Sequence, residues 1–366
     1  MREAFLQLLR GEKPDEVVWT ADISYWIDGR VHEGKADPNW QTELGHLELC
    51  RELGCMPFYW YGKFWAAESK FDGVKIINET KGDRRRCTWR TPVGDLIAET
   101  AFMKGSWSEA PVRYAVQTEA DLDILLYVLE RRRMEPTNLV DYQERLELWA
   151  GYDGVPCLGL PRSPMPSFVV DWAGVEHGSL LVLDYPEKVE AALDLMEQQD
   201  QPILDAVCAL APPVVHFPDN LSSANLTSFF DQHMDARYRR RLGQLHAAGV
   251  RCAVHLDGTV GGLLPKLAQV GFDSVEALTP KPVGDVGLQE MRTVAHSETL
   301  VLWGGIPGAM FAPPFSWADM QPHLETLLAS WQDERFIVGV ADQVPPNGDI
   351  EYVRQVAQLI ASRSSS

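Results

Sequence analysis

One stretch of the chain, residues 250–285, constrains the fold more than any other. It opens with the apolar run Val250–Leu256, passes through a glycine-rich turn, and then carries leucines at helical spacing over Leu263–Val270. Gly271 ends that helical pattern, and a second apolar run, Phe272–Leu278, follows it. Two strands joined through a helix favour a parallel βαβ unit, because parallel neighbours need a long crossover connection.

Strands and helices also alternate on either side of this stretch, over residues 117–361. No linker rich in serine or glycine divides the 366 residues, and (β/α)-barrels often reach this length as one unit. We therefore predict a single α/β domain over residues 1–366, a (β/α)8 TIM-type barrel with a polar, frayed tail at 362–366. The other predicted strands are Val155–Leu160, Val214–Phe217, Leu300–Trp303 and Phe336–Ala341, and the predicted helices include Asn138–Tyr152, Pro186–Leu210, Asp235–Ala248, Gly287–His296, Trp317–Trp331 and Asp349–Ile360.

Residues 1–116 have a different character and are predicted to form an N-terminal helical and β-hairpin elaboration. An amphipathic helix begins the chain, and Val17–Ile23 has the composition of a buried first strand. Alternating polar and apolar residues over 71–116, with Lys81-Gly82-Asp83 as a turn, predict antiparallel hairpins packed beside the barrel. Thr118 then begins a capped helix.

The charge of the chain excludes some partners. The formal net charge is −19 and the isoelectric point is about 4.9, so the surface repels phosphate backbones and anionic membranes, and nucleic acid is not an expected partner. Six cysteines are scattered without a CxxC pair, which is typical of a cytoplasmic protein with free thiols. No apolar run approaches the roughly 20 residues that span a bilayer, so we expect a protein that does not enter the membrane.

Polar residues stand where the predicted strands finish, which is where parallel barrels build their active sites. We expect these side chains to meet in one cleft. A histidine among carboxylates can hold a divalent metal, with zinc the first expectation, or it can act in general acid–base chemistry. Structural roles are the alternative, since Asp257 could cap the next helix and Asp342 could shape its own turn. The predicted catalytic residues are His255, Asp257, Glu276 and Asp219, of which His255, Asp257 and Glu276 form the predicted metal site.

Aromatic residues are dense between Tyr25 and Trp65 and could wall a substrate pocket. Rings in such a wall suit an aryl substrate by stacking or a quaternary ammonium by cation–π attraction. The alternatives are a place in the core or in a subunit interface, as in a homodimer. The glycine-rich segment 304–308 has neither GxGxxG nor a P-loop lysine, so a nucleotide site is not predicted. The predicted substrate-binding residues are Asp22, Tyr25, Trp26, Trp60, Asn220, Trp303 and Asp342.

Several segments resemble the uroporphyrinogen decarboxylase (URO-D) superfamily. They are HLDG at 255–258, followed by LLPKLAQVGFDSVEAL, PVGDVGLQEM, LVLWGGIP and ADQVPPNGDIEYVRQV, together with LLRGEKPDEVVW, TPVGDL and YAVQTEADLDIL earlier in the chain. The resemblance covers most of the chain and is most specific in its last third. It implies a distorted (β/α)8 barrel with the active site at its C-terminal face, in agreement with the fold inferred from the residue pattern.

The superfamily contains two chemistries, and this chain departs from the motifs of both. True decarboxylases carry an RQAGR motif where this chain has WTADISYWIDGR, which keeps only Arg30. The methyltransferases of corrinoid pathways use a zinc site built from His-x-Cys-Gly and a later cysteine. Here His255 and Gly258 are present, Asp257 replaces the first cysteine, and the segment 340–343 has no cysteine. An oxygen-rich metal site would suit a donor whose leaving group is held by metal.

The resemblance therefore implies a methyltransferase of the corrinoid branch. It would move a methyl group from a small O- or N-methylated substrate to a corrinoid carried by a separate protein, because the chain has no DxHxxG corrinoid-binding sequence. Two alternatives are kept open. One is a cofactor-independent decarboxylase or lyase with Arg162 in a cationic lining, and the other is a non-catalytic binding barrel.

Overall fold

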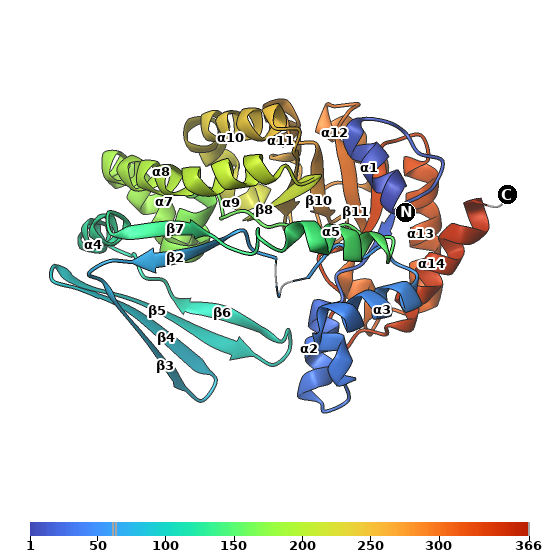
Figure 1. Ribbon diagram of the computed structural model, residues 1–366, viewed down its shortest axis with the longest axis horizontal. Coiled ribbons are helices and arrows are strands. Elements are labelled where there is room, and N and C mark those ends of the chain that lie inside the picture. The colour runs from blue at the N-terminus through green and yellow to red at the C-terminus, as the bar shows by residue number, and fades with distance from the viewer. Residues whose placement is uncertain (61, 63, 365–366) are drawn as a thin grey trace.

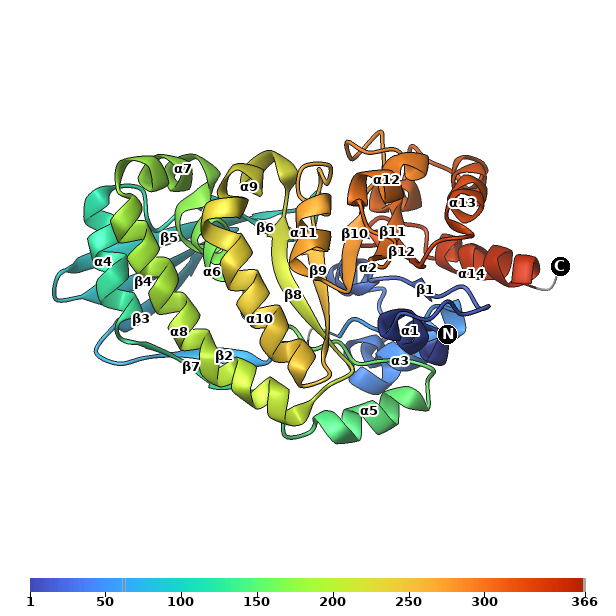
Figure 2. The ribbon, with the colours of Figure 1, turned by 90° about the horizontal axis from the view of Figure 1, so that it is seen from above.

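The computed structural model describes residues 1–60, 62 and 64–364. Its centre is a parallel sheet in the order β1-β12-β11-β10-β9-β8. Helices of the second half lie along the outer side of this sheet, with α8, α10 and α11 near β8 and β9 and with α12–α14 near β11 and β12 (Figure 2). The strands are β1 (Trp19–Thr20), β8 (Val214–Leu221), β9 (Arg251–Leu256), β10 (Ser274–Leu278), β11 (Val301–Pro307) and β12 (Phe336–Ala341).

Two extended segments close this sheet into a barrel. The first, residues 56–59, pairs with β1 through a hydrogen bond that Met56 N donates to Trp19 O, 2.8 Å long. The second, residues 155–160, pairs with the first through Cys157 N to Phe58 O and with β8 through Leu160 N to His216 O. Eight extended segments thus follow one another round the barrel, which confirms the predicted (β/α)8 architecture.

Side chains alternate between the barrel interior and the helix layer. Val214, Ala253, Val301 and Ile337 belong to an inner apolar cluster, whereas their neighbours in sequence belong to the outer cluster that the helices cover. Helix α1 supplies Phe5 to the inner cluster, where its ring lies 5.4 Å from that of Trp303. The inner face therefore has a defined parity along every strand, and residues of that parity near the strand ends face the mouth.

The helices carry the sequence signals that predicted them. Thr118 caps α4 in a capping box with Asp121, as expected. The last helix continues to Ser364, beyond the predicted end at Ile360, and positions 365–366 of the predicted tail lie outside the described residues. The helices are α1 (Arg2–Arg10), α2 (Ser24–His32), α3 (Glu43–Leu53), α4 (Glu119–Leu129), α5 (Tyr142–Ala150), α6 (Pro164–Ser167), α7 (Gly174–Asp184), α8 (Pro186–Leu210), α9 (Ser223–Phe229), α10 (Asp235–Ala247), α11 (Leu264–Val270), α12 (Met291–Ala295), α13 (Trp317–Trp331) and α14 (Glu351–Ser364). Short 3-10 turns are η1 (Pro38–Gln41), η5 (Leu288–Glu290) and η6 (Gly308–Phe311), and π-helical turns are η3 (Phe168–Ala173) and η4 (Phe230–Met234).

The N-terminal elaboration contains the predicted antiparallel hairpins. They form a four-stranded meander that projects from the barrel (Figure 1). The turn at residues 104–107 of this meander reaches α2, where the rings of Trp107 and His32 stack with their centroids 4.5 Å apart. This contact fixes α2, which supplies side chains to the mouth of the barrel. The meander strands are β3 (Lys75–Lys81), β4 (Arg84–Thr91), β5 (Gly94–Met103) and β6 (Ser108–Arg113), and a separate pair is β2 (Ala67–Phe71) with β7 (Arg132–Pro136).

The glycine-rich segment after Trp303 has a packing role. Gly304 lies inside β11 at φ 140°, and a Cβ there would come within 2.6 Å of the backbone nitrogen of Leu278. The glycine lets β10 and β11 approach each other, which accounts for it without a nucleotide site. Among the described residues, no helix combines the length and the apolarity that crossing a membrane requires.

Candidate active site

A buried histidine–carboxylate pair forms the floor of the barrel mouth. His255 and Glu276 hold paired positions on β9 and β10, and His255 Nδ1 lies 2.6 Å from Glu276 Oε2. Both residues have the inward parity of their strands, and both are buried. The two side chains are therefore in contact, as predicted.

Two further residues complete the surroundings of the Glu276 carboxylate. His216, from β8, places Nε2 3.2 Å from Oε2 of Glu276, and its own Nδ1 is buried without a hydrogen-bond partner. Tyr59, from the segment between β1 and β2, donates its hydroxyl to Oε1 of Glu276 at 2.5 Å. Two imidazoles and a phenol thus surround one carboxylate, which satisfies the requirement that a buried charge be paired and hydrogen-bonded.

The charges of this group determine one another. Burial alone would raise the pKa of Glu276, but His255 and His216 outweigh burial and hold the pKa well below the usual value for glutamate. Burial alone would lower the pKa of His255, yet the charges of Glu276 and Asp342 raise that pKa to about 10. In this state a protonated imidazole faces an ionised carboxylate.

The same residues fit a divalent metal. One ligand atom each from His216, His255 and Glu276 lie within 4.8 Å of one another. Two imidazole nitrogens and one carboxylate oxygen are an ordinary zinc ligand set that leaves a coordination position for water or substrate. The orphaned Nδ1 of His216 shows that the polar atoms of this floor are not all satisfied by the described protein groups.

A second group of metal-binding residue types is already satisfied. Asp273 accepts hydrogen bonds from His246 Nε2 at 2.8 Å, Arg251 Nη1 at 3.0 Å and the backbone nitrogen of Cys252 at 2.8 Å. Burial raises the pKa of the Cys252 thiol well above its usual value, which disfavours the thiolate that a metal would need. His246, Cys252 and Asp273 therefore have a structural role.

The floor opens into a cavity of about 390 Å³. Its walls include the aromatic rings of Tyr25, Phe64 and Trp65 and the guanidinium of Arg162. Asp342 also lines it, with Oδ1 3.7 Å from His255 Nε2 and 43% of its side-chain surface still exposed. Burial raises the pKa of Asp342 to about 7, with the neighbouring carboxylate of Glu276 acting in the same direction and His255 opposing it. Tyr25, Asn220, His255 and Asp342 are the predicted site residues that line this cavity.

Asp257 and Asp219 do not join this group. Asp257 lies one residue beyond β9 and is exposed, and the ligand atoms that converge come from His216, His255 and Glu276. Asp219 is fully buried and accepts hydrogen bonds from Ser163 N and from the Tyr238 hydroxyl, both at 2.7 Å. Asp219 stands three residues after the inward-facing His216, so the alternation of β8 places it on the side of helix α10.

Four other predicted substrate-binding residues are absent from the cavity lining. Asp22 accepts a hydrogen bond from Ser24 N at the start of α2, and Trp26 donates to Gly348 O at 3.1 Å. Trp60 packs against His46 with ring centroids 5.4 Å apart, and Trp303 lies inside the barrel, donating to Thr20 Oγ1 at 2.8 Å. The three tryptophans thus make packing contacts or hydrogen bonds with the protein itself, and Asp22 is hydrogen-bonded at the start of α2.

His216 and Tyr59 were missed at the sequence level. Strand parity was a usable signal for His216, because it stands two residues after Val214 in an apolar run and therefore shares the face of Val214. Tyr59 carried no comparable signal, since its neighbours Phe58 and Trp60 are also aromatic and show no alternation of polar and apolar residues.

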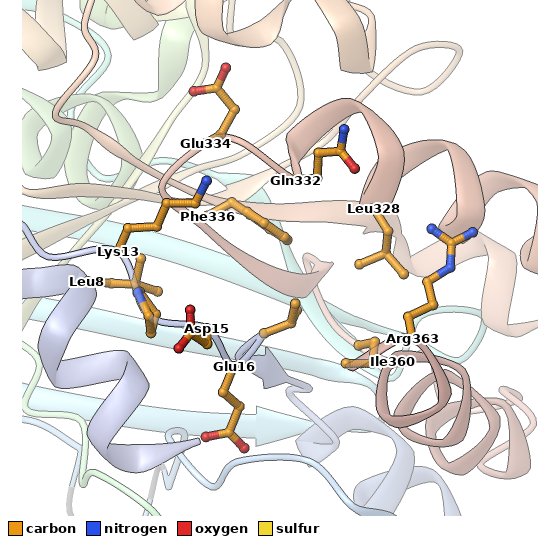
Figure 3. A pocket seen from close by; sticks show the side chains of 12 residues that line it. Leu8, Lys13, Asp15, Glu16, Leu328, Gln332, Glu334, Phe336, Ile360 and Arg363 are labelled. Atoms are coloured by element: carbon orange, nitrogen blue, oxygen red, sulfur yellow. The ribbon is translucent and has the colours of Figure 1, made fainter. Parts of the chain in front are cut away.

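A second cavity of about 360 Å³ lies at the opposite ends of the strands (Figure 3). It is bounded by α1, α13 and α14, with Leu8, Phe336 and Ile360 as apolar walls and Lys13 and Glu334 at its rim. None of the predicted site residues lines it. The chemistry-bearing residues therefore gather at the other end of the barrel.

Comparison with known proteins supports the fold. No protein-family model and no curated protein matches the chain, so membership of the URO-D superfamily stays a prediction. Among solved structures, the chain is similar to a methyltransferase from Methanosarcina mazei, with TM-score 0.60, 14% identity, and coverage of 100% of this chain and 99% of that one. It is also similar to a B12-independent methionine synthase from Shewanella sp. W3-18-1, with TM-score 0.54, 10% identity, and coverage of 95% and 97%. At these identities the likeness establishes a shared fold.

Proposed function

We propose that the chain is a methyl-transfer enzyme that uses a divalent metal, with zinc the first expectation, held by His216, His255 and Glu276. The observation that carries the proposal is the convergence of these three ligand atoms within 4.8 Å beneath an open cavity. A metal bound there would act as a Lewis acid on the heteroatom from which the methyl group departs. Both solved structures named above are methyl-transfer proteins by description, which supports the same chemistry.

The residues around the ligands have defined tasks in this proposal. Tyr59 holds Oε1 of Glu276 by its hydrogen bond and so fixes the direction of the carboxylate, as partners of metal ligands do. The rings of Tyr25, Phe64 and Trp65 enclose the donor and keep water from it. The donor is a small O- or N-methylated compound, and the acceptor is a corrinoid presented by a partner protein at the open mouth.

The decarboxylase alternative requires a cationic lining for an acidic substrate. Arg162 is the arginine that lines the cavity, but it forms an ion pair with Asp171 and donates Nε to Pro218 O at 3.0 Å. Asp28 shares the same lining, and its charge opposes an anionic substrate. The cavity therefore favours methyl transfer over decarboxylation of a polyacid.

Metal content in ligand variants tests the proposal. Protein purified without added metal and then loaded with zinc should retain a stoichiometric amount after dialysis, as measured by plasma mass spectrometry. His216→Ala, His255→Ala and Glu276→Ala should each lose most of it, whereas Asp257→Ala, the matched control at the mouth, should retain it. Circular dichroism checks that each variant is folded. Retention of zinc by folded His216→Ala, or its absence from the parent protein, would remove the proposed site.

Methyl transfer is measured separately. The zinc-loaded protein is mixed with free cob(I)alamin and candidate methyl donors, and the absorption of methylcobalamin is followed. Formation of methylcobalamin that depends on Glu276 supports the proposal. Evolution of carbon dioxide from an acidic substrate without zinc would favour the decarboxylase, and a metal-free protein that binds a ligand without turnover would favour a binding barrel.

A further inference from the structure

We propose that the cavity above His216 selects a methylated ammonium cation, in preference to a neutral ether or an anion. The inference rests on the proposed function in one respect only, namely that the bound cation is the methyl donor. The selection itself follows from the charge and the aromatic character of the cavity walls.

Two acidic side chains, Asp28 and Asp342, face the cavity. Asp28, on α2, lines it and has no hydrogen bond or ion pair with any residue that the structure describes. Asp342 lines it opposite His255, and more than two fifths of its side-chain surface is exposed there. Because carboxylates in a concave site focus a negative potential, a cation gains free energy on entering.

The phenol of Tyr25 lies within the electrostatic influence of these carboxylates. Its pKa is raised by burial and, next in order, by the charges of Asp342, Asp22, Asp28 and Asp257. Carboxylates from the loop after β12, from α2 and from the end of β9 therefore act on one point of the wall.

The positive groups on the described lining are already matched. Arg162 pairs with Asp171, and its Nη2 donates to Asn220 Oδ1 at 3.4 Å. His255 lies between Glu276, at 2.6 Å, and Asp342, at 3.7 Å. Neither group is free to hold an anion, so an acidic substrate would have to displace an existing partner.

Aromatic rings provide the second half of the recognition. Trp65 is 40% exposed, and its ring lies edge-on to that of Phe64 with centroids 4.9 Å apart. Phe64 in turn lies 5.6 Å from the ring of His216. The buried Nδ1 of His216, which lacks a partner, marks the inner end of this wall. Ring faces attract a quaternary or protonated amine, and they offer a neutral methyl ether only van der Waals contact.

A matched pair of probes tests the inference. Choline carries a quaternary nitrogen, and 3,3-dimethyl-1-butanol has the same shape with carbon in its place. Isothermal titration calorimetry on the full chain, with no methyl acceptor present, should give choline about tenfold tighter binding than the neutral compound. The affinity for choline should decrease as the salt concentration is raised, because part of the attraction is between charges.

Two variants locate the binding. Asp28→Asn and Trp65→Leu should each weaken choline binding several-fold, and Asp28→Asn should leave the affinity for the alcohol nearly unchanged. Asp83→Asn, which removes the same charge from the β3–β4 turn, is the control and should have no effect. Equal affinities for the two probes, or choline binding that is unchanged in both folded variants, would overturn the inference.

The experiment separates this inference from the proposed function. Selective choline binding without methyl transfer to cobalamin would leave the cation site standing and remove the methyltransferase. Methyl transfer from an aryl methyl ether, with no preference for choline, would do the opposite.

Discussion

Glu276 and His255 lie side by side on neighbouring parallel strands, with the Glu276 carboxylate 2.6 Å from the His255 imidazole although the residues are 21 positions apart in the chain. The contact depends on the register of β9 against β10. A slip by one residue would turn one of the two side chains into the helix layer. The electrostatics of the site are therefore set by the barrel itself.

The first prediction concerns the hydrogen bond from Tyr59 to Glu276. In Tyr59→Phe, a buried carboxylate oxygen loses a donor, so the free energy of unfolding should fall by about 2 kcal/mol, as expected for a hydrogen bond to a charged group. Chemical denaturation measures this. Zinc affinity should also fall, because the carboxylate is no longer held in one direction.

Tyr142→Phe is the matched control. Its buried hydroxyl donates to a neutral acceptor, Pro156 O, at 3.2 Å. Removing it should cost about 1 kcal/mol and leave zinc binding unchanged. Equal losses in the two variants, with zinc affinity kept in both, would show that Tyr59 does not position Glu276.

The second prediction concerns Asp219. Asp219→Asn keeps one oxygen but replaces the other with a group that cannot accept from Ser163 N or Tyr238 Oη. We expect the free energy of unfolding to fall by about 1–3 kcal/mol while zinc content is kept. Denaturation curves and metal analysis on the same sample check both parts. A variant of unaltered stability that lost zinc would place Asp219 in the site after all.

The barrel was predictable from the sequence for a physical reason. Apolar runs such as Phe336–Ala341 alternate with helical patterns such as Trp317–Trp331, and this order permits few architectures besides parallel βα units. The polar residues that end two adjacent strands, His255 and Glu276, then had to share one face because each follows the inward parity of its strand.

The remaining site residues depend on geometry that sequence alone does not carry. Asp219 is the exception, because its odd spacing from Val214 and His216 gives it the outward parity of β8, a signal that the sequence did carry. Tyr59 lies in the short extended segment 56–59, whose pairing with β1 and with residues 155–160 is a long-range contact. Asp257 has the correct parity but lies beyond the end of β9, in a loop whose path depends on neighbouring loops.

The third prediction is a pH dependence that originates at His46. Burial lowers the pKa of His46 to about 4, whereas an unfolded histidine titrates near 6.5. Between these values the unfolded chain binds the proton and the folded chain does not, so stability decreases as pH falls through this window and is fully present above it. The total effect is about 3 kcal/mol.

His46→Gln tests this origin. The variant should lose the part of the pH dependence that lies between about 6.5 and 4, as measured by the free energy of unfolding at several pH values. The criterion is the change of stability with pH, since the substitution also changes packing against Trp60 and so alters the stability at neutral pH. Parallel curves for the parent protein and the variant would assign the dependence to other groups.

The last prediction concerns the buried charges behind the barrel. Arg241, on α10, has no exposed surface and donates to Glu197 Oε2 at 2.6 Å and Asp200 Oδ2 at 2.7 Å. Arg241→Met would leave two buried carboxylates short of their partner and should lower the free energy of unfolding by about 3–5 kcal/mol. Arg239→Met on the same helix is the control, since Arg239 is 46% exposed in its pair with Asp235 and should cost less than about 1 kcal/mol. Urea denaturation at neutral pH compares the two, and similar small losses would mean that water reaches Glu197 and Asp200 once the guanidinium is gone.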